Sequence, residues 1–208
     1  MSPSLLSLYI SVSFVVSASP GPLMLACMSY GARVGVRATV ATMLGASLGN
    51  ILLMLLSALG LGLLITQTPW LLSAIKWIGA LYLIYLGLQQ WRAKPQTTGD
   101  ITSAQQAKSL FFSGMMISLS NPKGLIYFGA IFPQFIDYNQ PLVWQFSILT
   151  LIFLALDMLW MLIYAAAGYR LMRWLTTPRH QSLFNMVTGL VLIGAGFIMI
   201  FTGTLIHE

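Results

Sequence analysis

Long apolar stretches separated by short polar segments make up most of this chain. The segments 2–32, 38–75 and 180–207 contain no Asp, Glu, Lys or Arg. Each is longer than the roughly 20 residues that an α-helix needs to cross the hydrocarbon core of a bilayer. Hydropathy and helix-breaking residues predict six membrane-spanning helices, near residues 5–28, 38–65, 70–91, 109–132, 142–169 and 183–206.

The composition indicates an all-α integral membrane protein. Hydrophobic residues make up 58% of the chain and charged residues 7%, and the mean hydropathy is +0.84. A soluble domain carries about a quarter charged residues. A cleaved signal peptide is a less favoured interpretation of the first segment, because no basic residue precedes its apolar run. The net charge of +6 arises mostly in the connections, so we expect no nucleic-acid partner.

The basic residues predict how the helices are oriented. Eight of the ten Lys and Arg residues lie in the first, third and fifth connections, and the second and fourth connections have none. The eight are Arg33, Arg37, Arg92, Lys94, Lys108, Arg170, Arg173 and Arg179. The positive-inside rule assigns connections of this kind to the cytoplasm. Both termini are then expected on the outer side of the membrane.

A polar linker divides the predicted helices into two sets of three. Residues 94–108 are polar and show no apolar periodicity. They separate a first three-helix repeat, residues 1–93, from a second, residues 109–208. Because each half has an odd number of spans, the second must enter the membrane from the opposite side. We therefore expect two inverted repeats, inferred from the placement of features because the sequence identity between the halves is faint.

The first helix of each half contains a break. Pro20, Gly21 and Pro22 interrupt the first predicted helix, and Asn121 and Pro122 interrupt the fourth. Proline removes an amide donor and clashes with the preceding turn. At membrane depth such a break is tolerated only where protein or water satisfies the freed backbone groups. Paired breaks in two halves are the best sequence indication of a transporter's binding site, so all five residues are candidates for substrate binding.

Asp157 lies about midway along the fifth predicted helix. A carboxylate at the centre of a membrane helix costs about 2.5–3.5 kcal/mol on translocon scales, so it should face the protein interior and be paired or protonated. A proton-coupled carrier can use the change between those two states. A permanently paired structural acid is the alternative. Asn50 is the corresponding residue of the second helix, and it can bind substrate or only a neighbouring helix.

Lys123 follows Pro122 at the expected start of a half-helix. Its ammonium would add to the positive end of that helix dipole and to the free amides there, where a substrate carboxylate can bind. In one alternative the side chain extends to the membrane interface, and in another it only neutralises Asp157.

A stripe of small residues lies on the second predicted helix. Ala41, Gly45 and Gly49 recur at a spacing of four, which lets another helix approach closely. The partner helix can belong to the same chain or to a second copy in a homodimer. We assign the stripe no role in ligand binding.

Four motifs together resemble the lysine exporter and homoserine/threonine efflux (LysE/RhtB) family. They are SPGP at 19–22, GALYLIYLG at 79–87, SNPK at 120–123 and PQFI at 133–136. The resemblance covers nearly the whole chain and implies a bacterial inner-membrane exporter of amino acids driven by the proton-motive force. Many members look to carry an acidic residue at the position of Asn50. With one acid fewer, the site is expected to prefer a neutral substrate or to couple protons through Asp157 alone.

These features predict a site for an amino-acid zwitterion. The half-helix starts and Lys123 can bind its carboxylate, and Asp157 and freed carbonyls can bind its ammonium. We expect export of neutral or small polar or apolar amino acids by alternating access, with one three-helix half rocking against the other, and with no cofactor. A passive channel, or an exporter of another small metabolite or cation, is the alternative. A metal exporter or an enzyme would need ligand or catalytic groups that the predicted spans lack.

Overall fold

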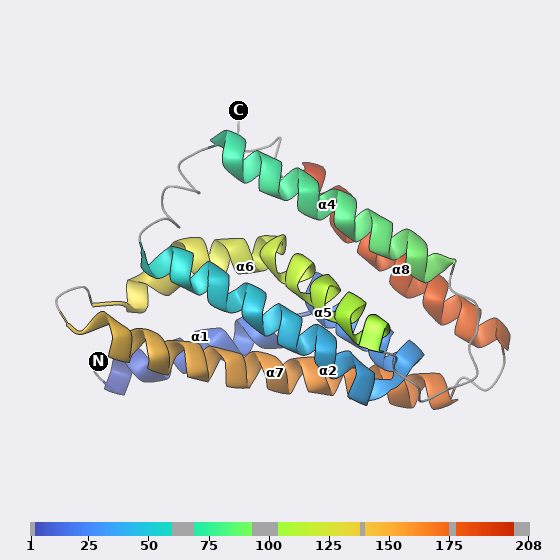
Figure 1. The fold of residues 1–208 in the computed structure, drawn as a ribbon, viewed down its shortest axis with the longest axis horizontal. Coiled ribbons are helices and arrows are strands. Elements are labelled where there is room, and N and C mark those ends of the chain that lie inside the picture. Colours follow the sequence, from blue (N-terminus) through green and yellow to red (C-terminus); the bar gives the residue numbers. More distant parts are fainter. Residues whose placement is uncertain (1–2, 60–68, 93–103, 138–139, 175–177, 202–208) are drawn as a thin grey trace.

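The described part of the chain is all-helical (Figure 1). The computed structural model describes residues 3–59, 69–92, 104–137, 140–174 and 178–201. These residues form seven α-helices and no strand. The helices are α1 (Pro3–Ala18), α2 (Pro22–Ala58), α4 (Pro69–Trp91), α5 (Ala104–Leu119), α6 (Pro122–Ile126), α7 (Leu142–Trp174) and α8 (Pro178–Phe201). A π-helical turn (Tyr127–Ile131) and a 3-10 turn (Phe132–Phe135) continue α6.

The helices follow the predicted pattern with three differences. The first and second predicted helices are joined, because α2 continues from Pro22 through the expected first connection. α5 begins at Ala104, inside the predicted linker, whose residues 94–103 lie outside the described residues. α8 begins at Pro178 rather than near 183. The expected ends at 60–65 and 202–206 also lie outside the described residues.

Two of the described helices are long and apolar enough to cross a membrane. They are α2 and residues 142–172 of α7, judged by length and composition. At 1.5 Å per residue, the 33 residues of α7 extend over about 50 Å, which exceeds the roughly 30 Å of a hydrocarbon core. The all-helical structure is thus consistent with a membrane protein.

A sharp kink at Gly35 joins the two parts of α2. Gly35 has φ 82° and ψ 161°, the single positive φ among the described residues. This backbone region is accessible essentially to glycine alone. The carbonyl of Gly35 accepts a hydrogen bond of 2.8 Å from Thr39 Oγ1, which supports the start of the second part. Glycine at this position therefore lets the chain reverse direction between two packed helical segments.

We expect Gly35→Ala to lower the free energy of unfolding by about 1–3 kcal/mol, the cost of a sparsely populated backbone conformation. A Cβ at Gly35 would meet no atom within 4 Å, so the loss would come from the backbone alone. Gly194→Ala is the matched control, because Gly194 is helical and its Cβ would also have open space. Denaturant unfolding of the purified protein in detergent measures both. Equal stability of the two variants would contradict the explanation.

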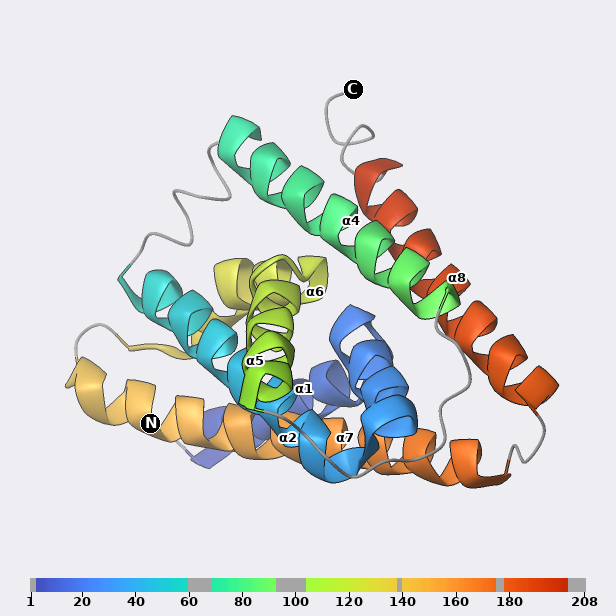
Figure 2. The ribbon, with the colours of Figure 1, turned by 45° about the vertical axis from the view of Figure 1, so that its right-hand side comes forward.

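The helices pack as a central group and a separate pair (Figures 1 and 2). α2 packs along both α5 and α7, whereas α4 packs along α8 and contacts the other helices much less. Glycines allow the closest approach: a Cβ on Gly45 would overlap the carbonyl of Phe111, and one on Gly114 would overlap that of Thr42. The small-residue stripe of α2 is therefore used for packing against α5 within the chain.

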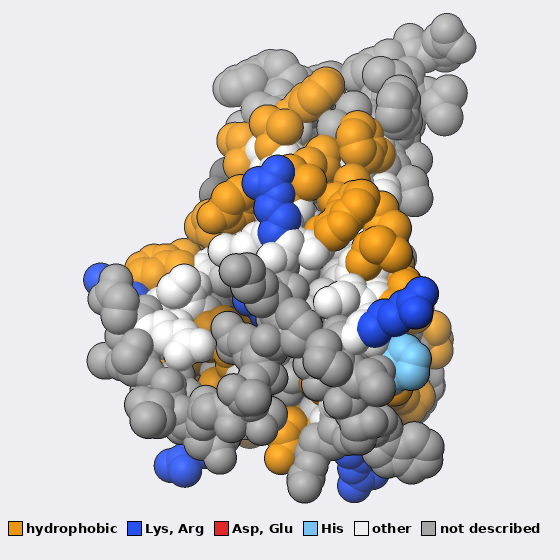
Figure 3. All heavy atoms as spheres, turned by 90° about the vertical axis from the view of Figure 1, so that its right-hand side faces the viewer, with side chains coloured by type: hydrophobic (Ala, Val, Ile, Leu, Met, Phe, Trp, Pro, Cys, Tyr) orange, Lys and Arg blue, Asp and Glu red, His pale blue; other side chains and the backbone are white. Residues whose placement is uncertain are grey.

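Most of the described basic residues lie near one end of the molecule, at the right of Figure 1. The kink of α2, the end of α4, the start of α5, the end of α7 and the start of α8 all meet there. Figure 3 shows this end, with several Lys and Arg side chains and no Asp or Glu side chain visible among the described residues. Such an asymmetry is the pattern that the positive-inside rule uses.

Candidate functional site

The two predicted helix breaks are present, and they lie against each other. α1 ends at Ala18 and α2 begins at Pro22, while α5 ends at Leu119 and α6 begins at Pro122. Pro22 and Pro122 each occupy the start of a helix, where a missing amide hydrogen costs nothing. Pro20 is exposed, outside both helices. The contact between the breaks is made by Lys123, whose ammonium reaches the end of α1.

Lys123 binds two backbone carbonyls at the first break. Its Nζ donates to the carbonyl oxygens of Val16 and Ser19 at 2.8 and 3.0 Å, and to Ser19 Oγ at 3.3 Å. A cation at a helix C-terminus also interacts favourably with the helix dipole. A Cβ on Gly21 would lie 3.5 Å from the same Nζ, so the backbone of the break passes close to the ammonium. The side chain therefore lies at the negative end of α1 rather than at the start of α6.

Asn121 caps the start of α6. Its Oδ1 accepts a hydrogen bond of 3.1 Å from the backbone amide of Lys123, and the residue is buried. Asparagine is among the preferred residues at this position. The cap explains why the chain restarts a helix directly after the break, and it holds the Lys123 backbone in place.

Asp157 and Asn50 are in direct contact. Asn50 Nδ2 donates to Asp157 Oδ2 at 3.0 Å, and Asn50 Oδ1 accepts from Ser118 Oγ at 2.6 Å. Asp157 is only 4% exposed, and Asn50 and Ser118 are also buried. The three side chains come from α7, α2 and α5, so this buried polar cluster links the central helices of the fold. A buried carboxyl with one such amide partner retains capacity to accept further hydrogen bonds.

The polar cluster lies between two hydrophobic clusters. On α7, Phe153 belongs to an aromatic cluster with Tyr9 and Tyr127, and Met161 belongs to a second cluster that includes Met24. Asp157 is one helical turn from each of these α7 residues. Its apolar surroundings make any interaction with a charged group stronger than it would be in water.

Lys123 and Asp157 form no direct ion pair in the described part of the chain. Their charges are nevertheless near enough to attract each other. The sequence left open whether Lys123 binds substrate, extends to the membrane interface or only neutralises Asp157. The structure adds a fourth arrangement, in which the ammonium binds the backbone at the first break.

Sequence reasoning missed two serines of this region. Ser118 completes the hydrogen-bonded cluster with Asn50. Ser17 lies beside the Asp157 carboxyl, and its buried hydroxyl has no hydrogen-bond partner among the described residues. A signal was present, because Tyr9, Ser13 and Ser17 are spaced by four residues and share one buried face of α1.

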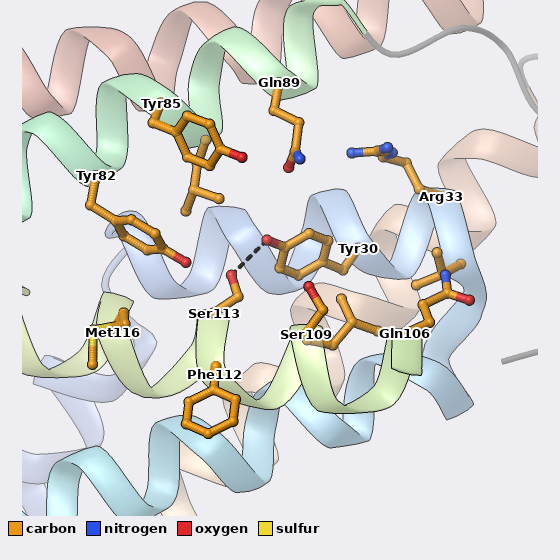
Figure 4. A pocket seen from close by; sticks show the side chains of 13 residues that line it. Tyr30, Arg33, Tyr82, Tyr85, Gln89, Gln106, Ser109, Phe112, Ser113 and Met116 are labelled. Atoms are coloured by element: carbon orange, nitrogen blue, oxygen red, sulfur yellow. Dashed lines mark hydrogen bonds between the residues drawn. The ribbon is translucent and has the colours of Figure 1, made fainter. Parts of the chain in front are cut away.

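A cavity of about 490 Å³ lies apart from these residues, between α2, α4 and α5 (Figure 4). Its lining includes none of the predicted site residues. Arg33 lines this cavity. From the sequence it was interpreted only as a basic residue in the connection between two helices.

The chain matches the family described as LysE type translocator over residues 14–203. It is 34% identical to the homoserine/homoserine lactone efflux protein of Salmonella typhimurium over 192 residues, which are 90% of this chain and 92% of that protein. It is 31% identical to the leucine efflux protein of Klebsiella pneumoniae over 84% of each chain. An uncharacterized membrane protein of Vibrio cholerae is 31% identical over 92% of this chain and 94% of its own length. No solved structure matches.

The helical fold and these relatives place the chain in a class of membrane transport proteins. The chain belongs to the LysE family of translocators, and amino-acid efflux proteins are among its relatives.

Proposed function

We propose that this chain exports neutral or small amino acids from the cytoplasm across the bacterial inner membrane, in exchange for protons. The observation that carries the proposal is the buried contact of Asn50 with Asp157 next to two helix breaks. An acid in an apolar interior without a direct basic partner costs free energy. Intramembrane acids of this kind therefore typically have a function. The amino-acid efflux proteins among the relatives support the substrate class.

The proposed substrate site lies between Asp157 and Lys123. The carboxylate of a zwitterion would bind the Lys123 ammonium and the free amides at the start of α2, near Gly21, with Asn121 holding the Lys123 backbone in place. Its ammonium would bind Asp157, with the free hydroxyl of Ser17 as a further acceptor. Carboxylate binding would replace part of the bonding between Lys123 and α1. Substrate would thereby loosen the contact between the two breaks.

Protons would be coupled through the same carboxyl. After substrate has left towards the periplasm, a proton from that side would bind Asp157 in place of the substrate ammonium. The proton would leave to the cytoplasm when the next substrate binds. Competition of one proton and one substrate for one site is sufficient for antiport.

The movement that we propose separates α4 and α8 from the other helices. α4 belongs to the first sequence half and α8 to the second, yet they pack along each other. α2 likewise packs against α5 and α7 of the other half. Rocking of one sequence half against the other would disrupt these interfaces. Movement of the α4–α8 pair against the central group would preserve them and give alternating access.

The proposed topology has six spans as two inverted repeats, residues 1–93 and 109–208, joined by a cytoplasmic linker at 94–108. Both termini would be periplasmic. The gathering of described basic residues at one end supports this orientation. A homodimer is compatible with the proposal but is not required by it.

Release of labelled amino acids from proteoliposomes tests the proposal. We expect saturable release of one or a few neutral amino acids, stimulated at least severalfold by an imposed proton gradient. Counterflow, in which unlabelled substrate on one side accelerates exchange of label, should also occur because carriers alternate between two faces. Release without saturation or counterflow would instead indicate a channel, and no release across the panel by folded protein would contradict an amino-acid substrate.

A further inference from the structure

The cavity between α2, α4 and α5 has the size and lining of a small-molecule site. Its volume of about 490 Å³ lies within the range of ligand pockets, about 300–1,000 Å³. Apolar and polar side chains both line it. Figure 4 shows the hydroxyls of Tyr30, Tyr82 and Ser113 converging at one side and Arg33 at the other. A charged group and hydroxyls at opposite sides suit a ligand with two polar ends.

Arg33 carries a charge that no acidic side chain neutralises in the described part of the chain. Its Nη1 donates to Gln90 Oε1 at 3.0 Å, and the side chain is half-buried. The described acids are Asp137, in the connection after α6, and Asp157, bound to Asn50. A guanidinium has five N–H donors, arranged to bind a carboxylate through two parallel bonds. Arg33 therefore retains donors for an anion.

Buried contacts from α8 hold Gln90 in the orientation that Arg33 needs. Gln90 Nε2 donates to Asn185 Oδ1 and to Thr188 Oγ1, both at 3.2 Å. These bonds use the amide nitrogen, so the Gln90 oxygen is directed to Arg33. A fixed guanidinium loses less conformational entropy when it binds a ligand than a mobile one.

Tyrosines form the opposite side of the cavity. Tyr30 OH and Ser113 Oγ share a hydrogen bond of 2.8 Å, and the Tyr82 hydroxyl points towards the same serine (Figure 4). The rings of Tyr82 and Tyr85 are stacked, with centroids 6.4 Å apart. Tyrosine hydroxyls accept hydrogen bonds and tyrosine faces attract cations, so this side suits an ammonium group.

We propose that this cavity is a first recognition site for the amino acid, with the substrate carboxylate on Arg33 and its ammonium against Tyr30, the tyrosine that lies beside Arg33 in Figure 4. This inference rests on the proposed function and adds a second binding site to it. The cavity lies at the end of the molecule that carries the basic residues, which the proposed topology assigns to the cytoplasm. Its Ser113 is five residues from Ser118 on α5, about 7.5 Å along the helix axis and about 140° around it. The substrate would move this short distance to reach the cluster around Asp157.

Two ligand pairs test the role of Arg33. L-Homoserine and L-homoserine lactone share an amino group, but the lactone has no carboxylate, and L-leucine and L-leucinamide differ in the same way. Uptake into inside-out proteoliposomes gives KM at the cytoplasmic face. We expect Arg33→Gln to raise the KM for the transported amino acid about tenfold to a hundredfold, because charge-assisted hydrogen bonds are lost. The KM for its carboxylate-free partner should rise less than about twofold. Arg37→Gln is the control, because Arg37 is exposed on the same helix and does not line the cavity.

Tyr30→Phe provides a second variant if Arg33→Gln reduces folding. It removes one hydroxyl acceptor near the ammonium, which both members of a pair carry. We expect KM to rise by a similar factor, about two- to tenfold, for both members. Equal KM changes within a pair for Arg33→Gln, or no change for Tyr30→Phe, would overturn the proposal while transport by the wild-type protein persists. Absence of wild-type transport of either pair would instead contradict the proposed function.

The lipid composition of the vesicles separates substrate from lipid as the anion on Arg33. In phosphatidylcholine vesicles no anionic headgroup is present, so a substrate carboxylate is the available partner. We expect the selective effect of Arg33→Gln to persist there. If it appears only in vesicles that contain phosphatidylglycerol, Arg33 binds a lipid headgroup and the recognition site is refuted.

Discussion

Asp157→Asn is expected to reduce proton-gradient-driven export to the level of protein-free liposomes. The asparagine cannot exchange a proton at neutral pH, and it removes the negative charge that would bind the substrate ammonium. The substitution preserves shape, and the new side-chain oxygen can still accept the hydrogen bond from Asn50. We therefore expect normal insertion and a folded protein. Gradient-stimulated efflux of labelled substrate, normalised to the amount of folded protein, measures the effect.

The matched control is Asp137→Asn. Asp137 is the other acidic residue in the described part of the chain, and it is exposed in the connection between α6 and α7. Its replacement should leave coupling intact. Normal coupling in Asp157→Asn would make the acid a structural residue and would remove the basis for proton exchange at this site.

Lys123→Ala is expected to weaken both substrate binding and the fold. Loss of the ammonium leaves the Val16 and Ser19 carbonyls without these hydrogen bonds inside the protein. The Val16 carbonyl keeps a hydrogen bond from Ser19 Oγ at 2.9 Å, whereas the Ser19 carbonyl loses the hydrogen bond from Lys123. One unsatisfied group costs about 1–3 kcal/mol, so a lower unfolding free energy follows. The proposed carboxylate contact is lost as well, and KM should rise at least about tenfold. Unfolding in detergent and substrate KM in proteoliposomes report the two effects separately.

A comparison with Lys108→Ala distinguishes a local effect from a loss of positive charge. Lys108 is exposed on α5 and contributes the same charge to the chain. Lys108→Ala should change neither the substrate KM nor the free energy of unfolding appreciably. If Lys123→Ala lowers stability while the folded fraction keeps its apparent affinity, Lys123 serves only to satisfy the end of α1.

Single residues with strong physical constraints were predictable from sequence. Prolines cannot continue a helix, so the breaks at Pro20–Pro22 and Pro122 followed directly, and α2 and α6 begin at Pro22 and Pro122. A carboxyl in an apolar run must face the interior, and Asp157 is buried. The small-residue stripe at Gly45 likewise indicated close packing, which α5 provides. The functional roles of these residues stay predictions.

Contacts between distant segments could not be read from the chain. The sequence placed Lys123 at the start of a half-helix, but its long flexible side chain reaches across to the end of α1 and binds two carbonyls there. The Arg33 cavity was missed because its polar residues come from α2, α4 and α5. Within each helix they follow a helical spacing, but that spacing does not say which helix faces meet. The Gly35 conformation was also unexpected, since a glycine between two arginines resembles an ordinary connection.

The sequence by itself determined a helical membrane protein of the LysE family, the positions of the breaks and the buried acid, because apolar length, proline geometry and the cost of a buried charge act locally. The tertiary structure decided which polar groups meet. Asn50 contacts Asp157, Lys123 contacts α1, and α4 packs along α8 across the two sequence halves. These pairings depend on how closely helices approach each other, and such distances are set by side-chain packing between segments that lie far apart in the chain.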